Sequence, residues 1–247
     1  MDSRTVKKLV VMGAPIAHSQ SPRIFAEFFK QYGICNATYY QLYADGTTPI
    51  RLLFNTLGLY GANVTSPLKN VAFASVDEAS ETARCLGAVN TIVNRDGRLH
   101  GYNTDPDGVR GALQVLGINP AHRHCYVLGA GGAAAAVAYT LAELSARPII
   151  INRTSDHALR LSNRLGVATV PMEYAKPKHG DLLFSCLPPK STLPQWDWDV
   201  FDWIFDSVYS GSPMEQIRTS HPLPRIGAKE WLYHQALAAF EVFFEGK

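Results

Sequence analysis

The sequence has little net charge and no long apolar run, and each absence excludes a class of protein. Its 23 Lys and Arg against 21 Asp and Glu leave a formal net charge of +2. Proteins that bind nucleic acid or acidic membranes usually carry a clustered basic field, and no such cluster occurs here. No segment approaches the roughly 18 apolar residues that a membrane span needs. We therefore expect no nucleic-acid or membrane partner.

The N-terminal segment and the cysteines point to the cytoplasm. Only residues 9–12 are apolar before the first glycine, which is far too short for the core of a signal peptide. The four cysteines stand far apart, with neither a C-x-x-C pair nor a metal-binding spacing. We therefore expect free thiols, no bound metal and a cytoplasmic location.

Short apolar runs alternate with segments of helical spacing along the whole chain. The expected strands are residues 8–13, 37–43, 60–65, 88–94, 98–102, 125–128, 148–151, 182–185 and 203–206. The expected helices are residues 21–32, 48–57, 77–86, 107–116, 133–144, 156–165 and 229–244. Such alternation builds mostly parallel sheets from βαβ units. Two series meet near Asp105, so we expect an α/β protein of two domains.

Two local signals refine this expectation. Ser21-Pro22 suits the start of the first helix, with Ser21 as its N-cap and Pro22 at its first position. Asp96-Gly97, between two expected strands, is a strong hairpin signal because both turn residues tolerate a positive φ.

A glycine-rich segment follows the strand at 125–128 and opens the next helix. Gly129-Ala130-Gly131-Gly132-Ala133-Ala134 fits the pattern G-x-G-x-x-A. The first glycine permits a tight turn, the second lets the backbone approach a pyrophosphate, and the small last residue lets helix and strand pack closely. The helix N-terminus offers free N–H groups to the phosphates. The segment predicts a dinucleotide site; the alternative is a plain glycine-rich turn.

The residues after the next strand bear on which dinucleotide is bound. A site for NAD would place Asp or Glu there, on the ribose 2′-hydroxyl. Here Asn152-Arg153-Thr154 stands instead, and a guanidinium favours the 2′-phosphate of NADP. The alternative is that Arg153 is an ordinary solvated surface residue.

Polar residues gather at the ends of several expected strands, where ligands bind in open α/β sheets. They are Ser19 and Ser21; Asn63, Thr65 and Lys69; Asn90 and Thr91; and Asn103, Thr104 and Asp105. Hydroxyls of a ligand need donors and acceptors of this kind, so the clusters favour a polyhydroxylated substrate. The alternative for the serines is that they only cap turns.

Together these segments resemble the shikimate dehydrogenase family over essentially the whole chain. Residues 13–22 look like its serine motif, 61–69 like its G-x-N-V-T-x-P-x-K signature, and 87–91 and 103–105 like its next two motifs. The resemblance implies an N-terminal, mostly parallel α/β substrate domain and a Rossmann-type nucleotide domain. The implied boundaries are 1–105 plus 227–247 for the substrate domain and 106–226 for the nucleotide domain.

The resemblance also implies an enzyme that uses NADP(H) to interconvert 3-dehydroshikimate and shikimate, a step of aromatic amino-acid biosynthesis. Lys69 and Asp105 are then the catalytic pair. The implied substrate contacts are Ser19, Ser21, Thr65, Asn90, Gln235 and Tyr209, with Asn63 either a contact or a loop-shaping residue. The implied cofactor contacts are Gly129, Ala130, Gly131, Gly132, Ala133, Asn152, Arg153, Thr154 and His157.

The chain departs from the family pattern at four places. Pro106 stands where glycine is usual, and His157 stands where many NADP-dependent members carry a second arginine. Residues 185–190 differ from the usual loop near the nicotinamide, and Trp231 replaces a common methionine. Each departure leaves open how the cofactor or the catalytic segment is held.

Three other functions stay open at this point. A quinate/shikimate dehydrogenase or an enzyme for an amino analogue differs only in a few pocket atoms. A non-catalytic ligand sensor has no need of both Lys69 and Asp105. A folate-type dehydrogenase shares the two-domain layout but is disfavoured by the serine motif. A monomer or a homodimer is equally compatible with the sequence.

Overall fold

The computed structural model describes residues 6–208 and 211–244. The chain divides into two compact units, residues 1–104 with 235–247, and residues 105–234. Residues 227–234 group with the second unit, whereas the predicted domain boundary at 226/227 assigns them to the first. That boundary stays a prediction.

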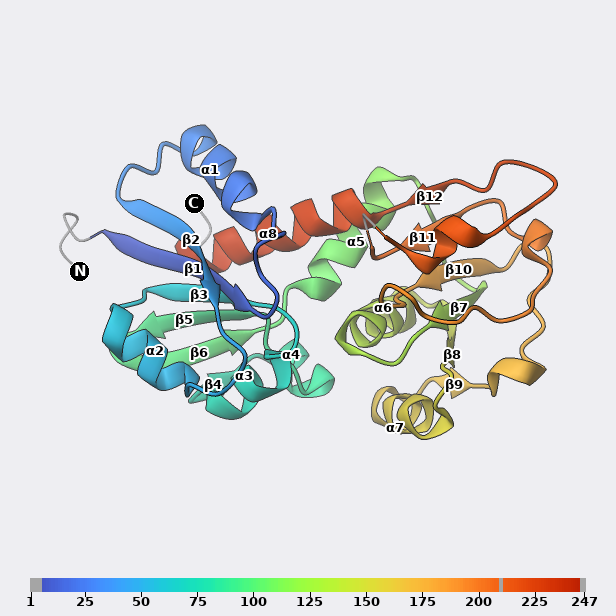
Figure 1. Cartoon of the computed structure of the whole chain (residues 1–247), viewed down its shortest axis with the longest axis horizontal. Coiled ribbons are helices and arrows are strands. Elements are labelled where there is room, and N and C mark those ends of the chain that lie inside the picture. Colours follow the sequence, from blue (N-terminus) through green and yellow to red (C-terminus); the bar gives the residue numbers. More distant parts are fainter. Residues whose placement is uncertain (1–5, 209–210, 245–247) are drawn as a thin grey trace. The chain divides into compact units, whose positions relative to one another are not determined.

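The first unit contains a six-stranded sheet in the order β2-β1-β3-β5-β6-β4 (Figure 1). The strands are β1 (Lys7–Gly13), β2 (Ala37–Tyr43), β3 (Gly61–Val64), β4 (Glu78–Ala79), β5 (Thr91–Arg95) and β6 (Arg98–Tyr102). β1 runs parallel to β2 and β3, whereas β5 is antiparallel to both β3 and β6. In the predicted hairpin, Asp96 and Gly97 have φ of 53° and 87°, as a type I′ turn requires.

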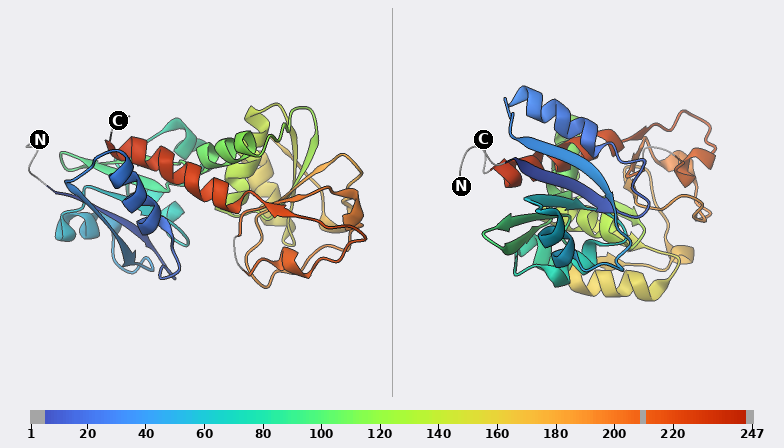
Figure 2. Two further views of the ribbon diagram at one scale, coloured as in Figure 1. Left: turned by 90° about the horizontal axis from the view of Figure 1, so that it is seen from above. Right: turned by 60° about the vertical axis from the view of Figure 1, so that its left-hand side comes forward.

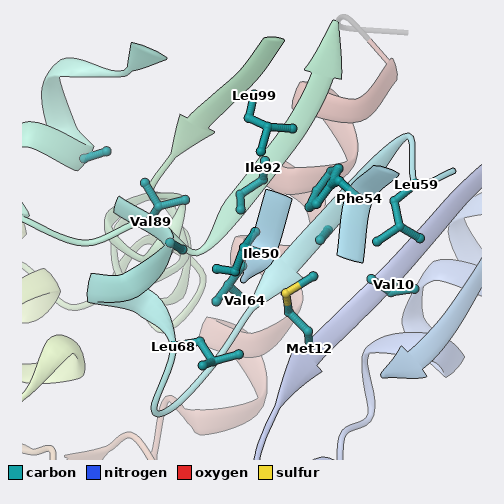
Figure 3. Packing of buried hydrophobic residues seen from close by; sticks show 13 residues of the cluster. Val10, Met12, Ile50, Phe54, Leu59, Val64, Leu68, Val89, Ile92 and Leu99 are labelled. Atoms are coloured by element: carbon teal, nitrogen blue, oxygen red, sulfur yellow. The ribbon is translucent and has the colours of Figure 1, made fainter. Parts of the chain in front are cut away.

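Helices cover both faces of this sheet. They are α1 (Ser21–Gln31), α2 (Ile50–Leu57), α3 (Lys69–Ser75), α4 (Glu81–Leu86) and the later part of α8 (Ala228–Phe244). On one face, α2 and α3 bury Phe54 and Ala72 with Met12 of β1 in one apolar cluster (Figure 3). On the other face, Figure 2 shows α1 beside α8, where the rings of Phe28 and Phe240 lie 5.5 Å apart. Burial of both sheet faces therefore fixes which way each strand residue points.

Two local predictions for the first unit are wrong. Gln20, not Ser21, is the N-cap of α1, and no side chain caps this helix. The helix expected over residues 77–86 is instead β4 followed by α4, because Ser80 accepts a hydrogen bond from the Ala83 amide and starts the helix there. The short helix α3 has no counterpart among the predicted elements.

The second unit contains a fully parallel sheet in the order β12-β11-β10-β7-β8-β9. Its strands are β7 (His124–Leu128), β8 (Arg147–Ile151), β9 (Ala168–Thr169), β10 (Leu182–Ser185), β11 (Ile204–Asp206) and β12 (Arg225–Ile226). Its helices are α5 (Asp105–Val115), α6 (Gly132–Glu143), α7 (Ser155–Leu165) and three short 3-10 helices at Met172–Tyr174, Trp198–Val200 and Pro213–Gln216.

The strand order of this sheet is that of a doubly wound fold. Counted from β7, the order is 3-2-1-4-5-6, and the chain reverses direction across the sheet between β7 and β10. Ligands of such sheets bind at the carboxyl ends of the strands that flank this reversal. The predicted α/β class with two mostly parallel sheets is confirmed. Among the described helices none combines the length and apolar character that a membrane crossing requires.

The packing of α8 on the first sheet predicts a strong effect of one small substitution. A Cβ added at Gly61 would lie 2.6 Å from the Phe243 ring and 3.0 Å from the Ile92 carbonyl oxygen. Gly61→Ala should therefore lower the free energy of unfolding by about 1–3 kcal/mol, the usual cost of overpacking a core. The melting temperature measured by circular dichroism reports the change.

Gly131→Ala is the matched control for this stability measurement. Nothing lies within 4 Å of a Cβ added at Gly131, and its φ of −87° suits any residue. Its melting temperature should stay within about a degree of the unaltered protein, since exposed substitutions of this kind rarely exceed about 0.5 kcal/mol. An unchanged melting temperature for Gly61→Ala would contradict the packing described here.

Candidate functional site

The loops that follow β1 and β3 are held tightly against each other. The Ala14 amide donates to the Ser66 carbonyl (3.1 Å), and the Thr65 amide donates to the Met12 carbonyl (2.9 Å). A Cβ at Gly13 would lie 2.5 Å from the Thr65 side chain and 2.8 Å from the Ser66 carbonyl oxygen. Glycine at position 13 therefore lets the segment with Thr65 lie directly beside the segment that leads to Ser19.

The serines of the first loop begin a chain of side-chain hydrogen bonds. Ser19 donates to Ser21 (3.3 Å), and the Ser21 hydroxyl bonds to the phenol of Tyr39 on β2. Tyr39 in turn donates to Oδ1 of Asn63 (2.7 Å). Burial raises the pKa of Tyr39 far above its usual range, an effect that the Ser21 hydrogen bond only partly opposes. Tyr39 is thus a neutral phenol that connects the serine loop to β3.

Strand register explains why these side chains meet. Tyr39 pairs with Leu9 and Asn63 pairs with Val11, on opposite sides of β1. Leu9 and Val11 are two residues apart, so their partners share one face of the sheet. Thr91 lies directly opposite Asn63 on β5. The register therefore lines up the three polar groups of Tyr39, Asn63 and Thr91 across β2, β3 and β5.

The hydrogen-bonded chain continues from Asn63 to the last helix. Nδ2 of Asn63 donates to Thr91 Oγ1 (3.0 Å), and Thr91 donates to Oδ1 of Asn90 (3.0 Å). Nδ2 of Asn90 donates to Thr104 Oγ1 (3.1 Å), and that hydroxyl donates to the carbonyl of Gln235 (3.0 Å). One network therefore links members of the predicted substrate motifs, namely Ser19, Ser21, Asn63, Asn90 and Thr104, with the backbone of Gln235.

Asn63 is fully occupied as a donor within this network. Its second amide hydrogen points to the Asn90 carbonyl oxygen (3.4 Å), so both N–H groups serve the protein. A ligand is left only with an acceptor position on Oδ1. Of the two roles that the resemblance leaves open for Asn63, the geometry favours the shaping of the site.

The network also contains residues that were not among the predicted catalytic, substrate or cofactor contacts. Tyr39 was only part of an aromatic strand, and Thr91 and Thr104 were polar neighbours of other candidates. Gln41, two residues after Tyr39 and on the same face, donates to the carbonyls of Ala17 and Ser19 (3.3 and 3.0 Å). The period-two pattern of a strand was the available signal, but it does not tell which of two adjacent tyrosines faces inward.

The two predicted catalytic residues each begin a helix. Lys69 is the first residue of α3 and is half-buried, and its carbonyl accepts from the Val89 amide (3.0 Å). Asp105 is the first residue of α5 and is only 6% exposed. Lys69 belongs to the first compact unit and Asp105 to the second. Tyr209, the remaining predicted substrate contact, lies outside the described residues.

The glycine-rich loop occupies the reversal point of the second sheet. Gly129 follows β7 with φ of 114°, a conformation that favours glycine, and a Cβ there would approach the Cys186 carbonyl oxygen after β10 to 3.0 Å. Gly131 is exposed, with open space where a Cβ would stand. Ala134 is fully buried against the sheet. The loop thus has the tight turn, the open approach and the close packing that a pyrophosphate site requires.

The loop after β8 provides the remaining predicted cofactor residues. Asn152 Nδ2 donates to the Thr154 carbonyl (3.0 Å), which shapes the turn into α7. Arg153 and His157 are both exposed, so their side chains are available to a phosphate. The segment Asn152-Arg153-Thr154 contains no Asp or Glu, which a site for NAD would place on the ribose 2′-hydroxyl. These residues fit the 2′-phosphate of NADP.

The structure shows the surroundings of residues at three of the departures from the family pattern. Pro106 lies in the first turn of α5, where a missing N–H costs nothing. Trp231 is buried and its ring lies 6.1 Å from that of Phe205. Ser185, at the end of β10, is fully buried, and its hydroxyl has no hydrogen-bond partner among the described residues. Pro106 and Trp231 are therefore accommodated by the packing of the second unit.

Comparison with known proteins identifies the family of the chain. Residues 11–92 match the family model of the shikimate dehydrogenase substrate binding domain. A shikimate dehydrogenase (NADP(+)) of Symbiobacterium thermophilum is 35% identical over 264 residues, covering 96% of this chain and 88% of that protein. The matched segment of the family model lies within the first unit.

Two solved structures share the fold over nearly the whole chain. Shikimate 5-dehydrogenase from Thermus thermophilus, solved with NADP(H) and shikimate, has a TM-score of 0.82 and 30% identity, covering 97% of this chain and 94% of that one. An Ael1 enzyme from Pseudomonas putida has a TM-score of 0.82 and 26% identity, covering 96% and 93%. On the sequence identity and coverage of these relatives, the chain belongs to the shikimate dehydrogenase family.

Proposed function

We propose that the protein catalyses the reversible, NADP-dependent reduction of 3-dehydroshikimate to shikimate. The observation that carries the proposal is the buried hydrogen-bonded network that joins the polar motifs of the first unit. A polyhydroxylated carboxylic acid needs such an array of fixed donors and acceptors. Relatives named shikimate dehydrogenase (NADP(+)) support the same activity.

The reaction needs a hydride on the carbonyl carbon and a proton on the carbonyl oxygen. NADPH, when bound, supplies the hydride. We assign the proton to Lys69, since an ammonium group is cationic at neutral pH and both stabilises a developing alkoxide and donates to it. Asp105 is assigned the orienting carboxylate of the pair.

The substrate contacts follow the motifs of the first unit. Ser19 and Ser21 are assigned to the carboxylate, and Thr65, Asn90 and Gln235 to the ring hydroxyls. Asn63 is assigned to shaping the site, because both of its N–H groups are used internally. Tyr209 keeps its assignment near the junction of substrate and nicotinamide.

The cofactor contacts follow the loops of the second unit. Backbone amides of the segment Gly129, Ala130, Gly131, Gly132 and Ala133 are assigned to the pyrophosphate, at the N-terminus of α6. Arg153 is assigned to the 2′-phosphate, with Asn152 and Thr154 shaping its turn and His157 as a weaker second contact.

Several finer expectations accompany this proposal. Residues 1–105 with 227–247 form the substrate domain and residues 106–226 the nucleotide domain. The cytoplasm and a monomer or homodimer remain the expected location and state. A preference for quinate or an amino analogue over shikimate is the alternative specificity, and a panel of these substrates with NADP⁺ separates the two.

Removing the amine of Lys69 should abolish most of the turnover. Lys69→Ala is expected to lower kcat by several orders of magnitude with a much smaller change in the KM for shikimate, because the contact is made mainly in the transition state. Steady-state NADP⁺ reduction measures both constants. Retention of more than about a tenth of kcat, a loss of only ~1.4 kcal/mol, would remove Lys69 from the chemistry.

Cofactor choice should depend on Arg153. One charge-assisted contact to a phosphate contributes roughly 1.5–3 kcal/mol, or about one to two decades in kcat/KM. Arg153→Ala should therefore narrow the ratio of kcat/KM for NADP⁺ over NAD⁺ by that amount, and His157→Ala by less.

Arg160→Ala is the matched control for cofactor choice. This exposed arginine lies further along α7, beyond the segment assigned to the cofactor, and should leave the ratio unchanged. Equal use of both cofactors by the unaltered enzyme would contradict the assignment of NADP, and a ratio that does not respond to Arg153→Ala would contradict the role of that residue.

A further inference from the structure

In the hydrogen-bonded network of the first unit, every side chain donates towards the next member in the order from Ser19 to Gln235. One backbone amide fixes this direction. The Thr104 N–H lies 2.8 Å from Oδ1 of Asn90 and can act only as a donor. The Asn90 side chain must therefore present its oxygen to Thr104. Thr91, which lies 3.0 Å from the same oxygen, must donate to it. The Thr91 hydroxyl has one hydrogen, so towards Asn63 it can only accept.

The same reasoning fixes the remaining members of the network. Asn63 must present its Nδ2 to Thr91, so its oxygen is turned to Tyr39. An amide oxygen cannot donate, and Tyr39 must therefore give its only hydrogen to Asn63. The phenol oxygen then has only lone pairs left for Ser21, whose oxygen in turn accepts from Ser19. Every donor from Ser19 to Gln235 points the same way along the chain.

Tyr39 contacts Asn63 on the side away from Thr91 and holds the side-chain oxygen of Asn63 in place. It is 8% exposed, and its ring stacks on Phe25 at 4.1 Å with an interplanar angle of 17°. Without its hydroxyl, Oδ1 of Asn63 is buried and loses its donor, which is costly. Asn63 is then held only through its N–H groups, which donate to Thr91 and to the Asn90 carbonyl oxygen. Its side chain shifts to bring the unpaired oxygen to a new donor, and this displaces the Thr91 hydroxyl that donates to Asn90.

We propose that Tyr39 is a positioning residue, which holds Oδ1 of Asn63 in place within this network and so determines how Asn90 and the serine loop are presented to the substrate. This inference rests on the proposed function. Tyr39 acts through Asn63 and Thr91 rather than by touching the substrate. The same chain of bonds predicts that Tyr39 and Thr91, which are not bonded to each other, depend on each other energetically.

A double-mutant cycle in the full-length enzyme tests this dependence. Tyr39→Phe keeps the ring stacking and removes only the hydroxyl, and Thr91→Val removes the relay at a fully buried side chain. Each change should raise the KM for shikimate by about 3- to 10-fold, which is what one ordinary hydrogen bond contributes, with kcat within about twofold. The double variant should show about the same increase as either single variant, because both cut the same chain.

Two conservative variants separate positioning from a general loss of structure. Thr91→Ser keeps the relaying hydroxyl and should keep the KM of the unaltered enzyme. Tyr40→Phe alters the next residue of β2, which is 62% exposed, and should have no effect. The dissociation constant of shikimate, measured by titration calorimetry, should follow the KM in every variant.

The outcomes separate the two proposals. If the unaltered enzyme does not oxidise shikimate, the proposed function is wrong and this inference falls with it. If it does, but Tyr39→Phe leaves the KM unchanged, Tyr39 has no positioning role. Independent, multiplying increases of about 10- to 100-fold in the double variant would also overturn the inference, since they would show two unconnected contacts. An increase in KM for Thr91→Ser equal to that for Thr91→Val would overturn the relay.

Discussion

The hydrogen bond from the Thr104 amide to the Asn90 side chain is the contact on which the polar part of the first unit depends. Buried polar groups are costly unless each finds a partner, and side-chain amides and hydroxyls can satisfy one another in more than one arrangement. A backbone N–H removes that freedom because it only donates. It selects one arrangement, which then extends through Thr91 and Asn63 to Tyr39 and the serines.

This arrangement is possible because the two faces of the first sheet are closed by apolar packing. Met12 and Phe54 belong to the cluster on one face, and Phe25 and Phe243 belong to the cluster on the other. Tyr39 shares in the second cluster through its ring, while its hydroxyl belongs to the network. Gly13 and Gly61 allow the loop and the helix to approach where any side chain would collide. The apolar packing thus holds the strands at the spacing that the hydrogen bonds need.

Much of the fold could be predicted because its signals are local. The strands β2, β6 and β10 have the predicted limits, and the Asp96-Gly97 hairpin forms as expected, because apolar runs and turn residues are read within a few positions. The short helix α3 was missed, since seven residues after a proline give too little periodicity. The helix over residues 77–86 was wrong at its start, because pairing of Glu78 and Ala79 with β6 outweighed local helical preference.

Most polar residues that the network joins could be predicted from the sequence, whereas Tyr39 and the connections between the residues could not. Serines, asparagines and threonines at strand ends are visible in the sequence, and so is the glycine pattern after β7. Their mutual distances depend on strand register, which pairs residues far apart in the chain, such as Asn63 with Thr91. Adjacent tyrosines on β2 have the same side chain, and only the register decides that Tyr39 faces inward and Tyr40 outward.

The proposed cofactor and substrate sites recognise polar groups in different ways. The proposed phosphate site of the second unit uses backbone amides and the room left by glycine at positions 129 and 131, and its proposed contact to the 2′-phosphate is an exposed residue, Arg153. The proposed substrate site of the first unit instead uses buried side chains whose donors and acceptors are fixed by one another. An exposed contact changes affinity by its own contribution, whereas a change inside a connected network alters its neighbours as well. Substitutions at the substrate side should for this reason be strongly non-additive, and those at the 2′-phosphate side close to additive.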